Sequence, residues 1–231
     1  MSGTLVQQVK GNGGGYQTLY TFSVTPTVGN FLQLNVGCGD VDYLTVTDDK
    51  GNTWNADKTQ TLTGERKINM LKVFNCAGGA TVVSLKFKTD LGADQYSDSA
   101  YILTEFSGIP TTDPIDQTVG GTTTAGTSFA SGNTATTTQA NELIVGAVCV
   151  TESTTTPGTL VYTGDAGYST VVYQPGFDQY TSIAFQYKSV SATGAQSITM
   201  TTNNSKSGST AIATYKEVVS SSVNSGFFQL L

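Results

Sequence analysis

The sequence predicts an all-β fold, an antiparallel β-sandwich of about ten strands. Only 12% of the 231 residues are charged, whereas 26 are Gly, 39 are Thr and 21 are Ser. This composition is poor in the long side chains that favour helices and rich in a β-branched residue that favours strands. No segment shows helical periodicity over more than two turns, and clusters of Gly, Asn, Asp and Pro separate the apolar runs.

Four segments carry the clearest strand patterns. Residues 32–36, Thr81–Lys88 and residues 183–187 alternate apolar and polar side chains, which is typical of half-buried strands with one wet face. Residues 143–150 are almost continuously apolar, as in a central strand that is covered on both faces.

The second half of the chain repeats motifs of the first half in the same order. GNFLQLNVGCG corresponds to ANELIVGAVCV, and AGGATVVSLKF corresponds to TGAQSITMTT. Asn30 aligns with Asn141, and Ala100 aligns with Ala211, both at a separation of 111 residues. These matches predict an internal duplication, although shared turn chemistry would imitate part of it.

The predicted organisation has three parts. Residues 1–15 form an N-terminal arm and glycine hinge, residues 16–219 form the sandwich, and residues 220–231 form an apolar tail. The halves 16–110 and 139–219 share one core, because neither buries much surface alone. Residues 111–138, rich in Thr and Gly, are expected to run over the surface between the halves. Two separate tandem domains are the alternative.

Apolar residues near the two ends are expected to dock on neighbouring molecules or on the sandwich itself. Apolar side chains on flexible tethers are costly to leave in water, so they favour a docked state. The expected docking residues are Leu5, Val6, Val9, Phe227, Phe228, Leu230 and Leu231.

The residue inventory argues against catalysis. The absence of histidine excludes Ser-His and Cys-His nucleophiles and histidine metal sites. No two of the five Glu residues share a predicted strand, so a glycosidase pair is not expected. Asp48 and Asp49 have calcium chemistry but are more simply explained as turn residues. We therefore predict no enzymatic activity, no cofactor and no metal. Three cysteines are expected to be buried thiols, with a Cys38–Cys76 bridge left open.

Charge and hydropathy exclude two classes of partner. The net charge is −6, and no Lys or Arg occurs between residues 89 and 187, so nucleic-acid binding is not expected. No apolar run is long enough to span a bilayer, and the N-terminus has no export-signal pattern. These features predict a protein made in the cytoplasm without a membrane span.

Aromatic residues among polar loops are the candidates for ligand contact. Trp54 follows a turn and would suit sugar stacking if exposed, although a buried anchor is the commoner role. Four tyrosines lie among Gly, Asp and Gln residues, as in recognition surfaces that use rigid tyrosines: Tyr162, Tyr168, Tyr173 and Tyr180. Strand-edge tyrosines that cover the core are the alternative.

The motifs GNxLxLxVG, VTDDKGNTW, AGGATVVSLKF, EFSGI followed by DPID, and ANELIVG together resemble jelly-roll-like modules of bacteriophage structural proteins and bacterial surface proteins. The resemblance implies a jelly-roll sandwich and a non-enzymatic virion protein that decorates the capsid or belongs to a fibre. Its implied partners are other virion proteins or further copies of itself, with host surface glycans as a further candidate. The alternatives are a carbohydrate-binding module of a tail fibre or bacterial surface protein, and an extracellular filament subunit.

Overall fold

The computed structural model describes residues 3–13, 18–39, 43–88, 98–112, 114–152, 160–176 and 180–218. Every regular element in these ranges is a β-strand, and every strand pair is antiparallel, so the predicted all-β class is confirmed. The strands are β1 (Thr4–Gly13), β2 (Leu19–Val24), β3 (Phe31–Gly39), β4 (Tyr43–Asp48), β5 (Asn55–Thr61), β6 (Arg66–Val73), β7 (Thr81–Lys88), β8 (Ser99–Ser107), β9 (Ile115–Ala130), β10 (Asn141–Thr151), β11 (Tyr162–Thr163), β12 (Val172–Pro175), β13 (Thr181–Ser191) and β14 (Thr199–Lys216).

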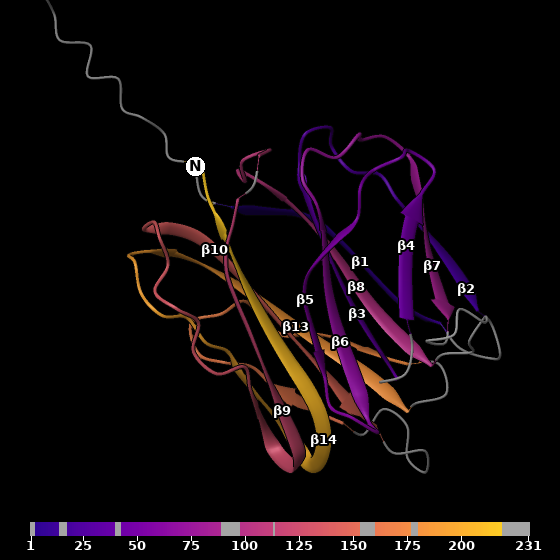
Figure 1. Ribbon diagram of the computed structural model, residues 1–231, viewed down its shortest axis with the longest axis vertical. Helices are drawn as coiled ribbons and strands as arrows, with labels where there is room; N and C mark the ends of the chain where they lie inside the picture. Colours follow the sequence, from indigo (N-terminus) through magenta and orange to yellow (C-terminus); the bar gives the residue numbers. More distant parts are fainter. Residues whose placement is uncertain are drawn as a thin grey trace, which may run out of the picture.

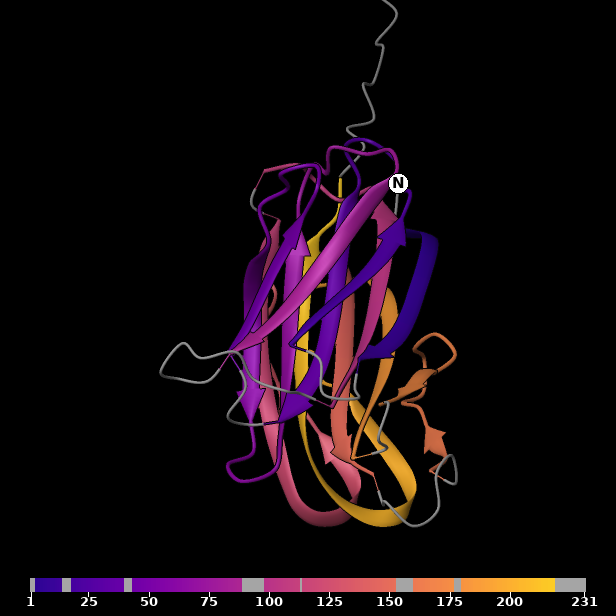
Figure 2. The same ribbon diagram turned by 90° about the vertical axis from the view of Figure 1, so that its right-hand side faces the viewer.

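The described strands form three sheets rather than the two of a simple sandwich. The central sheet has the order β1-β8-β3-β6-β5, and β2-β7-β4 form a smaller sheet against it. The third sheet has the order β11-β14-β10-β13-β12, with β9 also paired to β14. Figure 1 shows the three sheets side by side, and Figure 2 shows that most strands run near the long axis of the molecule.

Apolar layers fill the spaces between the sheets. Tyr20, Leu34 and Leu85 belong to the core between the small and central sheets. Phe31, Leu143 and Tyr215 belong to the core between the central and third sheets. A further apolar cluster lies on the outer face of the third sheet. The central sheet is therefore covered on both faces, and the apolar burial supplies the main drive for assembly.

This layering changes the environment predicted for β3. Gln33 and Asn35 alternate with apolar residues, but both are fully buried instead of facing water. The third sheet covers the face of β3 that carries these two side chains. The alternating pattern of β3 therefore separates a polar buried face from an apolar buried face, not a buried face from one in contact with solvent. The buried strand predicted at residues 143–150 is confirmed as β10.

Residues 3–13 are part of the central sheet, not a free arm. The whole of β1 pairs with β8, and residues 14 and 15 of the predicted hinge lie outside the described residues. A Cβ on Gly11 would lie 2.4 Å from Tyr101 Oη, and one on Gly13 would lie 2.5 Å from the Tyr20 ring. These two glycines therefore provide room for aromatic rings on a strand, not flexibility.

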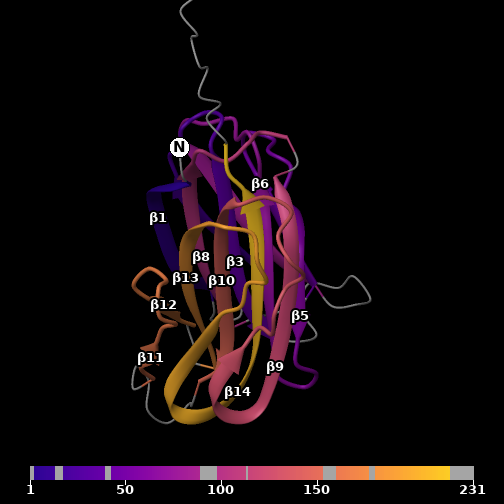
Figure 3. The same ribbon diagram turned by 90° about the vertical axis from the view of Figure 1, so that its left-hand side faces the viewer.

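The predicted surface excursion at residues 111–138 is also wrong over most of its length. Residues 115–130 form β9, which pairs with β14. Both strands curve back over the outer face of the third sheet (Figure 3). A Cβ on Gly121 would lie 2.2 Å from the Ala130 carbonyl oxygen, so this close return of the backbone requires glycine.

Candidate binding surface

Trp54 anchors a turn and is only partly exposed. Its ring packs against the apolar clusters that contain Leu32 and Leu34. Its indole Nε1–H donates to Asp48 Oδ2 at 2.8 Å. Asp48 also accepts hydrogen bonds from Lys50 N and from both nitrogens of Asn52. Burial opposes ionisation of Asp48, but these hydrogen bonds outweigh it and lower its pKa.

We expect Trp54→Phe to lower the free energy of unfolding by about 1 to 2 kcal/mol, because the Asp48 hydrogen bond and part of the packing are lost. Urea denaturation measures the change. Tyr180→Phe is the control, since Tyr180 is 49% exposed, and it should shift stability by less than about 0.5 kcal/mol. An unchanged stability of Trp54→Phe would contradict the anchoring role.

An open depression that includes Tyr168, one of the predicted tyrosines, lies on the third sheet beside the β11–β12 connection. It has a volume of about 550 Å³ and is lined by residues 162–171 and Gln186. The Gln186 side chain accepts from Asp165 N at 2.8 Å and donates to the Ser169 carbonyl oxygen at 2.5 Å. A Cβ on Gly164 would lie 2.2 Å from Gln186 Nε2, so glycine permits this contact. The loop is thus held in one shape by a strand residue.

Tyr168 lines this depression but is largely engaged by the protein. Its hydroxyl donates to the Ser197 carbonyl oxygen at 2.7 Å, and Lys188 Nζ lies 4.3 Å from its ring centroid. Burial, with a smaller contribution from the Asp165 carboxylate, raises the pKa of Tyr168. Burial lowers the pKa of Lys188, and Asp165 offsets part of that change. The site therefore presents mostly neutral polar groups beside one carboxylate and one ammonium group.

Tyr173 lies on β12 and faces Glu152. Its hydroxyl lies 3.2 Å from both carboxylate oxygens of Glu152, and its ring centroid is 5.2 Å from that of Tyr162. Burial and the Glu152 carboxylate raise the pKa of Tyr173. Tyr173 is thus a neutral hydrogen-bond donor at neutral pH.

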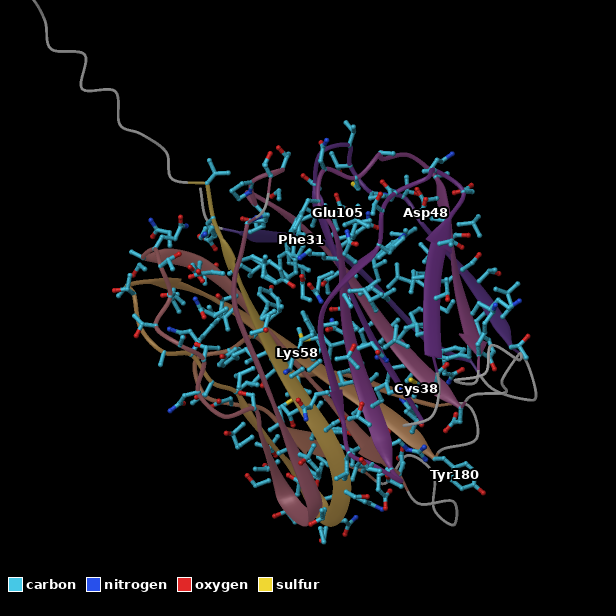
Figure 4. All side chains as sticks on the ribbon, in the orientation of Figure 1. Phe31, Cys38, Asp48, Lys58, Glu105 and Tyr180 are labelled. Carbon is cyan, nitrogen blue, oxygen red and sulfur yellow. The ribbon has the colours of Figure 1, made fainter. Side chains whose placement is uncertain are left out.

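The structure does not gather all the predicted aromatic residues into one site. Asp48, which binds Trp54, and the exposed Tyr180 lie at opposite ends of the molecule (Figure 4). Three residues of this region, Asp165, Gln186 and Lys188, were not predicted from the sequence. Their polar character was visible in the sequence, but only the pairing of β13 with its neighbours brings Gln186 beneath the 162–171 loop.

The predicted docking residues near the N-terminus have different environments. Leu5 packs against the core that contains Phe31, and Val9 packs against the core that contains Tyr20. A β-bulge between Leu5 and Gln7 leaves Val6 47% exposed. The bulge explains how residues four apart on one strand reach opposite faces. Phe227, Phe228, Leu230 and Leu231 lie outside the described residues.

Cys38, Cys76 and Cys149 are buried, and none of the three forms a disulfide. Burial raises the pKa of Cys149 to about 12. In the described ranges, no three His, Cys, Asp or Glu side chains come together in a way that could hold a metal ion. The search for a membrane-spanning helix, which covered the same ranges, found none.

In comparisons with known proteins, no family model, no curated protein and no solved structure matches the chain.

Proposed function

We propose that this chain is a non-enzymatic structural protein of a virion, a capsid decoration or fibre subunit built from two jelly-roll units that arose by internal duplication. The observation that carries the proposal is the strand order of the sheets. In an eight-stranded jelly roll, the first, eighth, third and sixth strands form one sheet, and the second, seventh and fourth lie in the other. The first half has β1-β8-β3-β6 packed on β2-β7-β4. It departs from the pattern in one strand, because β5 pairs with β6.

The second half supports the duplication with a corresponding order. Its sheet has β9-β14-β10-β13-β12, which parallels β1-β8-β3-β6-β5. The last residues of β9 pair with the first residues of β14, and β11 pairs with the other edge of this part of β14. In the first half, β2 and β4 pair with the two edges of β7 in the same way. Asn30 and Asn141, aligned in the sequence, immediately precede β3 and begin β10.

A structural role is also consistent with how the charged side chains are used. Asp48 holds the turn between β4 and β5, and Asp116 accepts two hydrogen bonds from Thr138. Such carboxylates stabilise loops instead of converging on a cleft. The two units share an apolar core, which favours a single stiff block for assembly.

Binding to particles tests the proposal. The full chain should co-sediment with virus particles from the culture that produces it, and antibodies against it should label intact particles. A variant that ends at residue 224 lacks the apolar FFQLL segment and should stay in solution. Val28→Ser is the matched control, since Val28 is 72% exposed and is not a predicted docking residue, and it should still bind. Equal binding by the truncated chain, or no binding by the full chain, would contradict docking through the terminal segment.

Carbohydrate binding is the second candidate, favoured by the preformed polar loop at residues 162–171. Neutral hydrogen-bonding groups fixed beside an aromatic ring suit an uncharged polyhydroxyl ligand. A glycan array with the full chain would show binding that is lost in Gln186→Leu and retained in Gln60→Leu. If the array shows no bound glycan, the proposal that this depression binds carbohydrate is contradicted.

A further inference from the structure

A lysine and an aspartate are buried against each other between the central and third sheets. Lys72 Nζ on β6 contacts Asp57 Oδ1 on β5, and their side chains are 13% and 0% exposed. The register between these strands shifts between Ala56 and Lys58, so Asp57 lies in a β-bulge. A bulge re-aims a side chain, and here it brings a carboxylate from an edge strand into the interior.

Aromatic rings surround this pair. Lys72 Nζ lies 4.9 Å from the centroid of Phe74, which stacks on Phe31 with centroids 5.2 Å apart. The ring of Tyr215 lies 4.6 Å from that of Phe31. In such surroundings a charged pair is poorly solvated. Transfer of one proton from the ammonium group to the carboxylate, which gives a neutral amine and a neutral acid, is therefore less costly than in water.

The hydroxyl group of Tyr215, on the third sheet, contacts the carboxyl group of Asp57. Tyr215 Oη lies 2.5 Å from Asp57 Oδ2 and 2.5 Å from Gln33 Oε1. Burial and the Asp57 carboxylate raise the pKa of Tyr215, so its hydroxyl keeps its proton. A fixed O–H donor at a carboxyl oxygen stabilises the negative charge that develops there when a nucleophile adds to the carbon.

We propose that Lys72 and Asp57 condense spontaneously to form an intramolecular isopeptide bond. After the proton transfer, the neutral Lys72 amine attacks Cγ of Asp57 and forms a C–N bond. The C–Oδ1 bond then breaks, and that oxygen leaves as water with one proton from the acid and one from nitrogen. The ammonium and carboxylate become one amide and one water, so atoms and charge balance and no oxidant or activating group is required.

Three features of the site favour this step over a permanent ion pair. The reacting groups are held in contact by two paired strands, which removes most of the entropic barrier of a bimolecular reaction. The Tyr215 hydroxyl remains available to the amide oxygen after the reaction. The product also replaces two buried charges with a neutral group, which removes their desolvation cost.

The cross-link would fasten edge strand β5 to β6. An edge strand is held by backbone hydrogen bonds on one side only, so it is the strand most easily peeled from a sheet. A covalent bond at this position would resist unfolding by force or heat. The inference stands on the described contacts alone and does not depend on the proposed virion role.

Intact mass spectrometry of the denatured full chain tests the proposal. The wild-type chain should be lighter than its sequence mass by one water molecule, and fragmentation should give a branched peptide that joins Lys72 to Asp57. Lys72→Arg should have its full sequence mass. Tyr215→Phe, which keeps the ring and loses the hydroxyl, should accumulate the lighter form more slowly after synthesis.

Lys58→Arg is the matched control, since Lys58 follows Asp57 on the same strand, and it should keep the loss of water. A full-mass wild-type chain after prolonged incubation would overturn the proposal. So would a loss of water that persists in Lys72→Arg, because dehydration would then have occurred elsewhere.

Discussion

Glu105→Ala is expected to lower the free energy of unfolding by about 4 kcal/mol, since hydrogen bonds to a buried carboxylate are stronger than neutral ones and their donors are left unpaired. Glu105 lies on β8 and is fully buried. Its Oε1 accepts from Thr27 N at 2.9 Å and from Asn30 Nδ2 at 2.5 Å, and Oε2 accepts from Gln7 Nε2 at 2.5 Å. One side chain thus joins β1, β8 and the connection from β2 to β3.

Chemical denaturation of the full chain measures this loss. Glu105→Gln keeps the size of the side chain but replaces one acceptor oxygen with a donor, so its loss should be smaller and still exceed about 1 kcal/mol. Asp49→Ala is the control, because this exposed carboxylate accepts one hydrogen bond, from Val82 N. A Glu105→Ala chain no less stable than Asp49→Ala would show that the network contributes little.

The strands that sequence patterns predicted best are those whose side chains repeat regularly. Thr81–Lys88 forms β7, and its alternating Val83, Leu85 and Phe87 are all buried. The pattern predicted burial but not how many sheets would stack. Gln33 shows the limit: a polar residue at an alternating position normally faces water, yet here it faces another sheet. Pairwise sheet contacts are long-range in sequence, and a local pattern carries no information about them.

The segments that were predicted wrongly are rich in glycine. In β1 and β9, glycine serves close packing, as at Gly11 against Tyr101 and Gly120 against Gln60. From composition alone, a glycine-rich hinge cannot be distinguished from a closely packed strand that contains glycine. The distinction depends on the partner side chain, which lies at least 60 residues away in both cases.

The candidate site was predictable only in part. Tyr168 and Tyr173 were predicted as candidate ligand-binding residues, and in the structure their hydroxyls bind Ser197 and Glu152. Gln186 lies on a strand with an ordinary alternating pattern, so nothing local marked it. Its role follows from the glycine opposite, since a side chain at residue 164 would exclude it.

The folded chain is expected to lose stability as pH rises toward neutrality, because the carboxyl group of Glu142 is buried. Glu142 is fully buried at the start of β10, and its carboxyl oxygens accept no hydrogen bond of good geometry from the described residues. Burial and the neighbouring Asp116 carboxyl raise the pKa of Glu142 from 4.5 to about 7, and weaker interactions with Thr214 and Gln139 offset part of this rise. The neighbouring charged groups are Asp116 and Lys216, its register partner on β14.

The sign of the effect follows from the raised pKa. Below pH 4.5 the group is protonated in both the folded and unfolded chains, so its stabilising contribution is complete. Between pH 4.5 and 7 the unfolded chain releases the proton first, and the contribution is progressively lost. Wild-type stability at pH 8 should therefore be about 2 kcal/mol lower than at pH 5 from this group alone.

Glu142→Gln should remove this pH dependence, because the amide mimics the protonated acid and can donate to Asp116. Urea denaturation at pH 5, 6, 7 and 8 should give converging curves at low pH, with the variant more stable at pH 8. Thr214→Val is the control, since it removes a hydroxyl that lowers the pKa of Glu142 but no ionisable group, and its stability should depend on pH at least as strongly as that of the wild type. Equal pH slopes for wild type and Glu142→Gln would contradict the raised pKa and mean that Glu142 is ionised in the folded chain. The carboxylates of Glu142 on β10 and Asp116 on β9 would then repel each other.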